Sequence, residues 1–234
     1  GVAGESAVKE LYRNYYSKAG GDRNNLRTNP GVMFQLLAME RAVVRALRIA
    51  ELDLANAKIL DVGCGGGGGT FQLLRLGAVI GNFTGIDIFP ERLEDARNIF
   101  PNARWVREDA SRMGFADGEF NLVVEFTMFA TLPDEELSAR IAAEMVRVCK
   151  PQGYLLLVDW RTPKPGDVNY SALTRKRLKK LFRKNEMELV GAFPGALVPP
   201  IGRFLSAYFP SIYFLAAAIF PFLVGQVAYL LRKK

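Results

Sequence analysis

The amino-acid sequence predicts an α/β fold in which parallel strands alternate with crossover helices. Short β-branched runs in the middle of the chain are each followed by an amphipathic stretch, and this alternation is typical of a parallel sheet covered by helices. A glycine-rich turn follows the first of these strands. The chain has 234 residues, half of them hydrophobic, which is enough to bury a full sheet. We therefore expect a single domain over residues 1–234.

The individual elements follow from hydrophobic periodicity and from the positions of glycine and proline. Two helices, over 5–19 and 32–52, are expected before the sheet, and residues 1–54 would cover it. Pro90 and Pro133 stand at helix starts, where a missing N–H costs little. Strands are predicted at 58–62, 82–87, 103–107, 120–126 and 153–159, and helices at 69–76, 90–100 and 134–149, with the central core of the domain over 55–160.

The C-terminal part of the chain contains a long apolar stretch. No charged residue occurs from Phe204 to Leu231, a length that raises the question of a membrane span. Pro210 and Pro221 argue against a span, because each would break or kink a helix. Within 161–234 we predict a basic helix at 171–184, a strand around 187–192, an apolar insertion at 194–222 with short helices at 203–209 and 211–220, and a last strand at 224–232.

Composition restricts the chemistry. The chain contains no histidine, which removes the commonest general base and the commonest metal ligand together. Its two cysteines, Cys64 and Cys149, are too few for a disulfide framework and lack the spacing of metal ligands. We expect reduced thiols, no metal site, and a reaction that runs without imidazole.

The formal net charge of +7 is unevenly distributed. Residues 161–184 contain nine Lys or Arg against one acid, Asp167. Such a basic surface could meet phosphates, anionic lipid or only water. The first residues lack a charged start followed by an apolar stretch and a cleavage site. We therefore expect no signal peptide and a cytoplasmic location, with the inner membrane surface as an alternative.

The glycine-rich turn reads Asp61-Val62-Gly63-Cys64-Gly65-Gly66-Gly67. A strand that leads through glycines into a helix lets the backbone approach a nucleotide-type ligand closely. By spacing alone the turn is ambiguous, because Gly63, Gly65 and Gly68 also fit the G-x-G-x-x-G pattern of dinucleotide enzymes. Five consecutive glycines argue against a purely structural turn, because ordering them costs conformational entropy.

Acids near the turn favour a sulfonium cofactor over a pyrophosphate. Asp61 stands two residues before the first glycine, where a carboxylate would pair with the ammonium of a methionyl group and would repel a pyrophosphate. Asp87 closes the second strand and places an acceptor pair at a ribose diol. The sign of the charge at Asp61 therefore favours the sulfonium cofactor.

These positions resemble those of the class I S-adenosylmethionine-dependent methyltransferases that act on small molecules. Asp109-Ala110 resembles the adenine site of that family, with Ile88 flanking the ring, and the match extends through 118–124 and 144–154. The resemblance implies a Rossmann-like, doubly wound seven-stranded sheet with an antiparallel last strand, and S-adenosylmethionine as the cofactor. It assigns cofactor contacts to Asp61, Gly63, Gly65, Gly67, Asp87, Ile88, Asp109, Ala110 and Glu125.

Methyl transfer from a sulfonium needs a base only if the acceptor keeps its proton. Ligands bind at the carboxyl ends of strands in open α/β sheets, so Glu125 and Asp159 are the candidate catalytic carboxylates. Glu125 could instead contact the cofactor or be a solvated strand end. Arg161 is a candidate substrate contact, or it forms an ion pair with Asp159 that orders the next loop. Tyr12 and Tyr16 are candidate substrate contacts over the cofactor, although such a stripe is more often packing.

The acceptor is predicted to be a small or lipid-like molecule and not a nucleic acid. The exit of the fourth strand, 125–130, lacks the Asn or Asp followed by two prolines that is typical of methylases acting on base amines. The segment 197–200 resembles small-molecule methyltransferases of glycan and secondary-metabolite assembly. We expect the apolar insertion to roof the acceptor pocket. Membrane contact through 203–222 and the basic helix 171–184, or plain core packing, remain open.

The leading hypothesis is a metal-independent methyltransferase that acts on oxygen. Carbon methylation of a quinone or polyketide ring is the alternative reaction, since it needs less of a base. A scaffold that holds the cofactor without catalysis is the alternative of another class. A nicotinamide dehydrogenase is disfavoured by Asp61.

Overall fold

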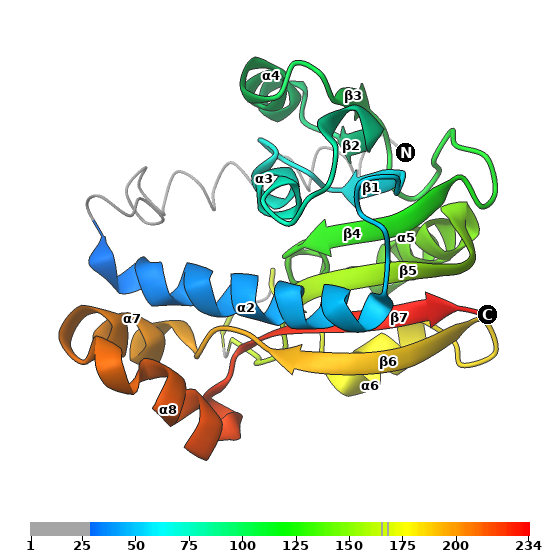
Figure 1. Cartoon of the computed structure of the whole chain (residues 1–234). Helices are drawn as coiled ribbons and strands as arrows, with labels where there is room; N and C mark the ends of the chain where they lie inside the picture. Colours follow the sequence, from blue (N-terminus) through cyan, green and yellow to red (C-terminus); the bar gives the residue numbers. More distant parts are fainter. Residues whose placement is uncertain (1–28, 165, 168) are drawn as a thin grey trace.

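The chain folds around a seven-stranded sheet with the strand order β3-β2-β1-β4-β5-β7-β6 in the computed structural model, which describes residues 29–164, 166–167 and 169–234 (Figure 1). Strands β1 to β5 pair in parallel, whereas β7 runs antiparallel to both β5 and β6. This confirms the predicted Rossmann-like sheet and its antiparallel last strand. The strands are β1 (Ile59–Val62), β2 (Phe83–Asp87), β3 (Arg104–Arg107), β4 (Phe120–Phe126), β5 (Cys149–Trp160), β6 (Met187–Pro194) and β7 (Gln226–Lys233).

Helices and short 3-10 turns connect these strands. Each predicted helix after residue 29 has a counterpart, whereas the helix predicted at 5–19 lies outside the described residues. The helices are α2 (Met33–Ala50), α3 (Gly68–Leu74), α4 (Pro90–Ile99), α5 (Glu135–Val148), α6 (Arg175–Leu181), α7 (Pro199–Tyr208) and α8 (Tyr213–Ile219). The 3-10 turns are η1 (Pro30–Val32), η2 (Ile80–Asn82), η3 (Phe129–Thr131), η4 (Pro210–Ile212) and η5 (Pro221–Leu223).

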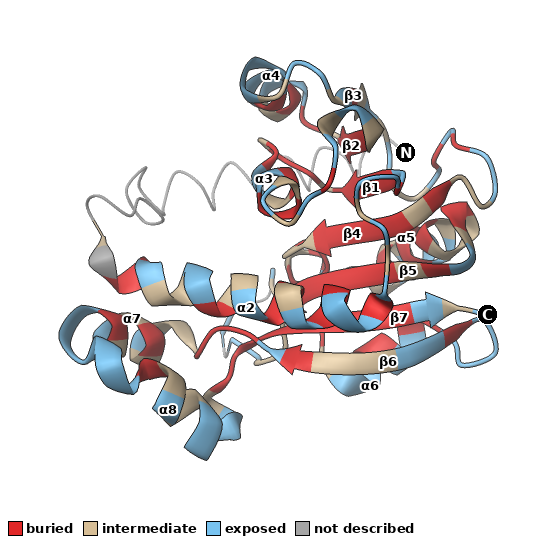
Figure 2. Ribbon diagram, in the orientation of Figure 1, coloured by how far each residue is buried: buried red, intermediate tan, exposed pale blue. Residues whose placement is uncertain are grey.

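Two cores form because alternate strand residues point to opposite faces of the sheet. Leu155 and Leu157 of β5 pack toward one face, in the cluster that includes α5 and α6. Leu156 and Val158 pack toward the other face, where buried alanines and Val43 of α2 cover β5 and its neighbours. Figure 2 shows the resulting sheet as mostly buried. Helices on both faces make the doubly wound arrangement that the sequence predicted.

The predicted basic helix at 171–184 is shorter in the structure, where α6 spans Arg175–Leu181. Thr174 caps its first turn, since its hydroxyl accepts a hydrogen bond from the backbone N–H of Arg177 at 3.2 Å. Before the cap, the N–H of Leu173 donates to the carbonyl of Trp160 at 2.8 Å, so this segment follows the end of β5. Residues 171–173 are therefore a connection, and not a helical turn.

The apolar insertion leaves and rejoins the sheet at one edge. Pro194, at the end of β6, pairs with Val227, and Trp160, at the end of β5, pairs with Gln226 at the start of β7. Its first helix begins at Pro199, four residues before the predicted start, because proline fits the first helical turn. Among the described residues, no helix is both long and apolar enough to cross a membrane. Figure 1 shows α7 and α8 at the side toward which the β4 and β6 arrows point.

Candidate functional site

The glycine-rich turn crosses from β1 to α3 beside the end of β2. The backbone N–H groups of Gly63 and Cys64 donate to the carbonyl of Ile86 at 2.9 and 3.0 Å. Gly65 has a φ of 52°, and a Cβ added there would lie 2.3 Å from the Arg92 guanidinium. A larger residue would therefore be strained and would displace Arg92. The turn needs glycine both for its conformation and for close approach.

Asp61 lies near the end of β1 and is 1% exposed. The Thr70 hydroxyl donates to its Oδ2 at 3.3 Å, and no other side chain in the described part of the chain donates to it. Burial raises the pKa of Asp61 to about 7, nearby Asp87 adds to the increase, and the Thr70 donors oppose it. A cation beside this carboxyl would stabilise its ionised form. Asp61 therefore favours the binding of a positively charged ligand.

Asp87 fixes the turn to the end of β2. Its Oδ2 accepts from the N–H of Gly65 at 2.9 Å, and its Oδ1 accepts from the N–H of Phe89 at 3.0 Å. A carboxylate has about four acceptor positions, so each oxygen can still accept a ligand hydroxyl. Half-buried Ile88 follows it at the rim. The structure therefore holds Asp87 where a diol could bind beside the glycine turn.

Asp109 and Ala110 follow β3, the strand next to β2. The Oδ1 of Asp109 accepts from both the N–H and the hydroxyl of Ser111 at 2.8 Å. The N–H of Glu108 donates to the carbonyl of Asp87 at 3.2 Å, which brings this segment against the end of β2. Asp109 is exposed and Ala110 is half-buried, so both can meet a ligand from the rim.

Glu125 and Asp159 form a buried pair of carboxyls at the ends of β4 and β5. Both are 0% exposed. Glu125 Oε2 accepts from the N–H of Met128 at 2.8 Å, and no residue in the described part of the chain bonds its Oε1. Asp159 accepts from the N–H of Ala130 at 2.8 Å and from the N–H of Trp160 at 2.7 Å. Glu125 is therefore not a solvated strand end.

Burial sets the protonation of this pair. It raises the pKa of Glu125 well above the usual range, and the neighbouring charges of Asp159 and Asp61 raise it further. Burial raises the pKa of Asp159 to about 7, against the backbone donors and the charge of Arg177. Burial therefore favours the protonated form of both carboxyls.

A strained turn positions these carboxyls. Thr127 has a φ of 65°, a left-handed conformation that a β-branched residue seldom adopts. Its N–H donates to the carbonyl of Val158 at 2.9 Å, and the chain then turns so that the N–H of Met128 reaches Glu125. Strain of this kind costs about 1–3 kcal/mol and is common at functional sites.

Arg161 does not pair with Asp159, so one of the two roles considered for it is wrong. Its Nε donates to the carbonyl of Val224 at 2.8 Å, and its Nη2 donates to the carbonyl of Pro221. Each oxygen of Asp159 instead accepts one backbone N–H. Arg161 therefore anchors the end of the apolar insertion to β5. Tyr12 and Tyr16, the other predicted substrate contacts, lie outside the described residues.

Sequence reasoning missed Arg177, which lies in the basic helix but is 7% exposed. Its guanidinium ties α6 to the connection between β4 and α5, the segment that supplies the N–H donors to Glu125 and Asp159. Its position among other basic residues gave no signal of burial. It donates to the carbonyls of Phe129 at 2.8 Å, Leu132 at 2.7 Å and Ser171 at 2.6 Å, to Ser138 Oγ at 2.9 Å and to Glu135 Oε1 at 2.6 Å.

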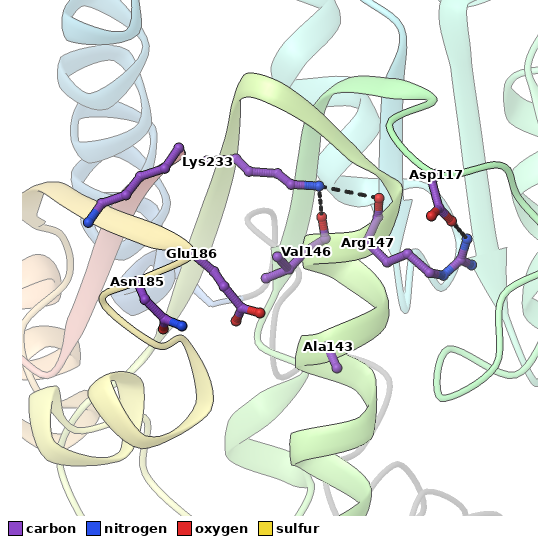
Figure 3. Close-up of a pocket in the computed structure, with 8 residues that line it drawn as sticks. Asp117, Ala143, Val146, Arg147, Asn185, Glu186 and Lys233 are labelled. Atoms are coloured by element: carbon purple, nitrogen blue, oxygen red, sulfur yellow. Dashed lines mark hydrogen bonds and ion pairs between the residues drawn. The ribbon is translucent and has the colours of Figure 1, made fainter.

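A separate pocket of about 440 Å³ lies at the opposite edge of the sheet (Figure 3). Its lining comes from the end of α5, the turn before β6 and the end of β7. Lys233 Nζ donates there to the carbonyls of Val146 at 2.7 Å and Cys149 at 2.8 Å, and Arg147 pairs with Asp117 at 2.7 Å. Lys233 and Arg147 at this edge therefore already have partners, and no predicted site residue lines the pocket.

The sheet topology and the acidic residues at the ends of β1 and β2 together define a class of protein. A seven-stranded sheet with an antiparallel last strand, a glycine turn after β1 and acids at the ends of β1 and β2 are the features that the sequence associated with class I methyltransferases. The buried, cation-seeking carboxyl of Asp61 fits the ammonium of S-adenosylmethionine, and Asp87 fits its ribose. A pyrophosphate would not fit beside Asp61.

Residues 59–153 match the family model described as "Methyltransferase domain". This segment of the chain is a methyltransferase domain of the S-adenosylmethionine-dependent class. The chain is 35% identical over 105 residues to a 2-methyl-6-phytyl-1,4-hydroquinone methyltransferase of Synechocystis sp., covering 44% of this chain and 31% of that protein. It is 34% identical over 113 residues to a phthiotriol/phenolphthiotriol dimycocerosates methyltransferase of Mycobacterium ulcerans, covering 47% and 40%. The matched region thus spans less than half of either relative.

Solved structures share the fold over most of the chain. A SAM-dependent methyltransferase from Methanosarcina mazei superposes with a TM-score of 0.58 at 21% identity, covering 80% of this chain and 96% of that one. The [4+2]-cyclase SpnF superposes with a TM-score of 0.57 at 18% identity, covering 83% and 81%. The second similarity shows that this fold also occurs in a protein named for a different reaction.

Proposed function

We propose that the chain transfers a methyl group from S-adenosylmethionine to an oxygen of a small or lipid-like acceptor in secondary-metabolite or glycan assembly. The single observation that carries the choice of donor is Asp61, a buried carboxyl beside the glycine turn with Thr70 as its side-chain donor. S-adenosylmethionine supplies an electrophilic methyl group on a sulfonium, and its ammonium is the cation that Asp61 needs.

The residues of the turn have separate roles in holding the donor. Asp61 would accept the ammonium, and the free acceptor positions of Asp87 would bind the ribose hydroxyls. Asp109 would accept a hydrogen bond from the exocyclic amine of the adenine through Oδ2, since its Oδ1 already accepts hydrogen bonds from Ser111. Ile88 and Ala110 would flank the ring. These contacts orient the methyl group, and orientation supplies much of the rate in such displacements.

The pair formed by Glu125 and Asp159 would receive the proton of the acceptor. When the acceptor oxygen takes the methyl group from the sulfonium, its hydroxyl proton would pass to a carboxylate of the pair, and the sulfur would keep the bonding electrons. Asp159, whose pKa burial raises to about 7, is matched to this task near neutral pH. Glu125, whose pKa burial raises well above the usual range, would keep its own proton and present Oε1, which no described residue bonds, to the acceptor. The proton then leaves to solvent when the product is released.

The acceptor chemistry is inferred from the surroundings and from relatives. The insertion beside this edge carries no charge from Phe204 to Leu231, which suits an apolar molecule. Both curated relatives are named for hydroxyl-bearing compounds with long hydrocarbon parts, a phytyl hydroquinone and dimycocerosates. An acceptor of that kind partitions into bilayers, so we propose that the enzyme acts at a membrane surface.

Carbon methylation of a quinone ring is the second candidate, because one relative is named for a hydroquinone. The two reactions differ in their need for a base. For oxygen methylation we expect Glu125→Gln and Asp159→Asn to lower kcat by about 10²–10⁴-fold with little change in KM. Full rates in both variants, measured with a phytyl hydroquinone, would favour the carbon route.

Calorimetric titration of the full chain with S-adenosylmethionine and with its demethylated product tests the donor. We expect both to bind, and S-adenosylmethionine to release protons near neutral pH because its ammonium lowers the pKa of Asp61. No binding of either compound would exclude the proposal. Binding without turnover on any lipid extract would support the scaffold alternative, and fluorescence-detected binding of a reduced nicotinamide would revive the dehydrogenase.

A further inference from the structure

The apolar insertion presents a row of large side chains to solvent. We call this row the apolar rim; its members lie on α7, α8 and the turns beside them and are each between 51% and 72% exposed. In Figure 2 the outer surfaces of α7 and α8 are exposed, in contrast to the buried sheet. Contiguous exposed apolar patches mark interaction sites. The apolar rim consists of Phe204, Tyr208, Phe209, Leu215, Ile219 and Phe222.

The inner side of the insertion is fixed to the domain. Tyr213 is 0% exposed, and its hydroxyl accepts from the N–H of Leu197 at 3.2 Å. Ser206 is buried, and its hydroxyl accepts from the N–H of Phe34 at 3.2 Å. These anchors hold the rim outward, so its exposure does not come from a loosely packed segment.

The backbone of the insertion is prepared for an apolar environment. Pro199, Pro210 and Pro221 begin α7, η4 and η5, which removes backbone donors at helix starts. At the connections, the N–H of Phe209 donates to the carbonyl of Leu205 and the N–H of Phe220 donates to that of Ala216, at 2.8 and 2.9 Å. An unpaired N–H is costly in lipid, where no water can replace its partner. These helix ends therefore suit a lipid environment, in which backbone donors need partners within the chain.

The rim lies beside the candidate active site. Both ends of the insertion join the sheet at the edge that carries Glu125 and Asp159, through the pairs Pro194–Val227 and Trp160–Gln226. Arg161, two residues after Asp159, holds the end of the insertion by its bond to Val224. A surface that contacts the rim therefore lies next to the place where an acceptor would enter.

We infer that the apolar rim inserts into the interfacial layer of a lipid bilayer and docks the enzyme where its acceptor is dissolved. The inference rests on the proposed lipid-like acceptor. With 10 and 7 residues, α7 and α8 are too short to span a bilayer, and their aromatic side chains suit its interface. The basic helix contributes less than its composition indicates, because Arg177 is buried and Lys180 pairs with Glu135 at 3.2 Å.

Flotation of the full chain with phosphatidylcholine vesicles tests this docking. Because the rim is uncharged, wild-type protein should float with neutral vesicles equally at about 0.1 M and about 1 M salt, where the screening length falls from about 10 Å to about 3 Å. The pair Leu215→Asp and Ile219→Asp should reduce the bound fraction by at least about tenfold. A matched control, Val79→Asp and Ile99→Asp, changes residues that are 48% and 62% exposed elsewhere and should float like wild type.

Three outcomes would overturn the inference. The first is that wild-type protein does not float with neutral vesicles, and the second is that it floats only with anionic vesicles at low salt. The third is that wild-type protein binds no vesicles but sediments as a dimer, which the Leu215→Asp and Ile219→Asp pair converts to a monomer. Circular dichroism of both pairs checks that they fold. Titration with S-adenosylmethionine separates this inference from the proposed function. If the wild-type protein binds the cofactor but does not float, only the docking inference is overturned. If it floats but does not bind the cofactor, only the proposed methyltransferase function is overturned.

Discussion

The two edges of the sheet use charge in opposite ways. At the edge where β1, β4 and β5 end, Asp61, Glu125 and Asp159 are buried, and their donors among the described residues are N–H groups and one hydroxyl. At the opposite edge Arg147 donates to Glu144 and Asp117, each at 2.7 Å. Arg147 also binds the carbonyls of Phe115 and Met113, and Lys233 binds those at the end of α5.

The difference separates a ligand site from a structural junction. A buried carboxyl without a cation destabilises the folded chain, and a ligand that brings the cation recovers that loss. Charges that satisfy one another stabilise the fold and leave nothing for a ligand to complete. The pocket in Figure 3 is a concave surface of the second kind, so its volume does not make it the active site.

Removing the charge at Asp61 should have the largest effect on binding. Asp61→Asn keeps the shape of the side chain but removes the partner of the ammonium, and we expect S-adenosylmethionine to bind about a hundredfold more weakly. Titration calorimetry measures this change. Asp117→Asn at the opposite edge is the control and should leave the affinity unchanged. Equal affinity of wild type and Asp61→Asn would contradict the assignment of Asp61.

Much of this edge could be predicted because its signals are local in the sequence. Asp61 and Asp87 each follow a short hydrophobic run and flank the glycine turn, so strand, turn and acid could be read together. The start of β5 was harder to predict, because Pro151 and Gln152 resemble a turn. The strand nevertheless begins at Cys149 and includes Gln152, whose φ is 63°. A register shift between β4 and β5 accommodates that irregularity.

Long-range contacts could not be predicted. Arg177 has the same composition around it as its solvent-exposed neighbours, and its burial depends on carbonyls more than forty residues away. Arg161 likewise binds Val224, which is 63 residues further along the chain. The insertion is apolar all round, so periodicity did not indicate which face would pack on the domain. Its anchors, Ser206 and Tyr213, became clear only from the structure.

Removing the central cation of the junction should lower stability without weakening cofactor binding. Arg147→Ala leaves Glu144 and Asp117 without their partner and frees two carbonyls, so we expect a loss of about 1–3 kcal/mol in the free energy of unfolding. Urea denaturation followed by circular dichroism measures it. The affinity for S-adenosylmethionine at a temperature where the variant is folded should match wild type. A tenfold loss of that affinity would show that the two edges are coupled.

The pH dependence of stability should have opposite signs at the two edges. The pKa of Asp61 is raised from its ordinary 3.8 to about 7, so the cofactor-free folded chain keeps a proton that the unfolded chain loses. Stability from this group is complete below pH 3.8 and is lost as pH rises through about 7. Glu144 behaves conversely, since hydrogen bonds from Arg147 lower its pKa below the ordinary 4.5. Its contribution is present above 4.5 and is lost as pH falls.

Thermal unfolding between about pH 4 and about pH 8 separates these two contributions, because each protonated group changes the slope by up to about 1.4 kcal/mol per pH unit. Asp61→Asn should reduce the decline in the free energy of unfolding as pH rises toward 7. Its stability at acidic pH should vary with pH as in wild type. Glu144→Gln should flatten the acid side alone. S-adenosylmethionine, by pairing with Asp61, should reduce the decline toward pH 7 in wild type and have no such effect in Asp61→Asn. Parallel curves for wild type and Asp61→Asn would mean that Asp61 is already ionised in the folded chain, and the argument for a cation-seeking carboxyl would fail.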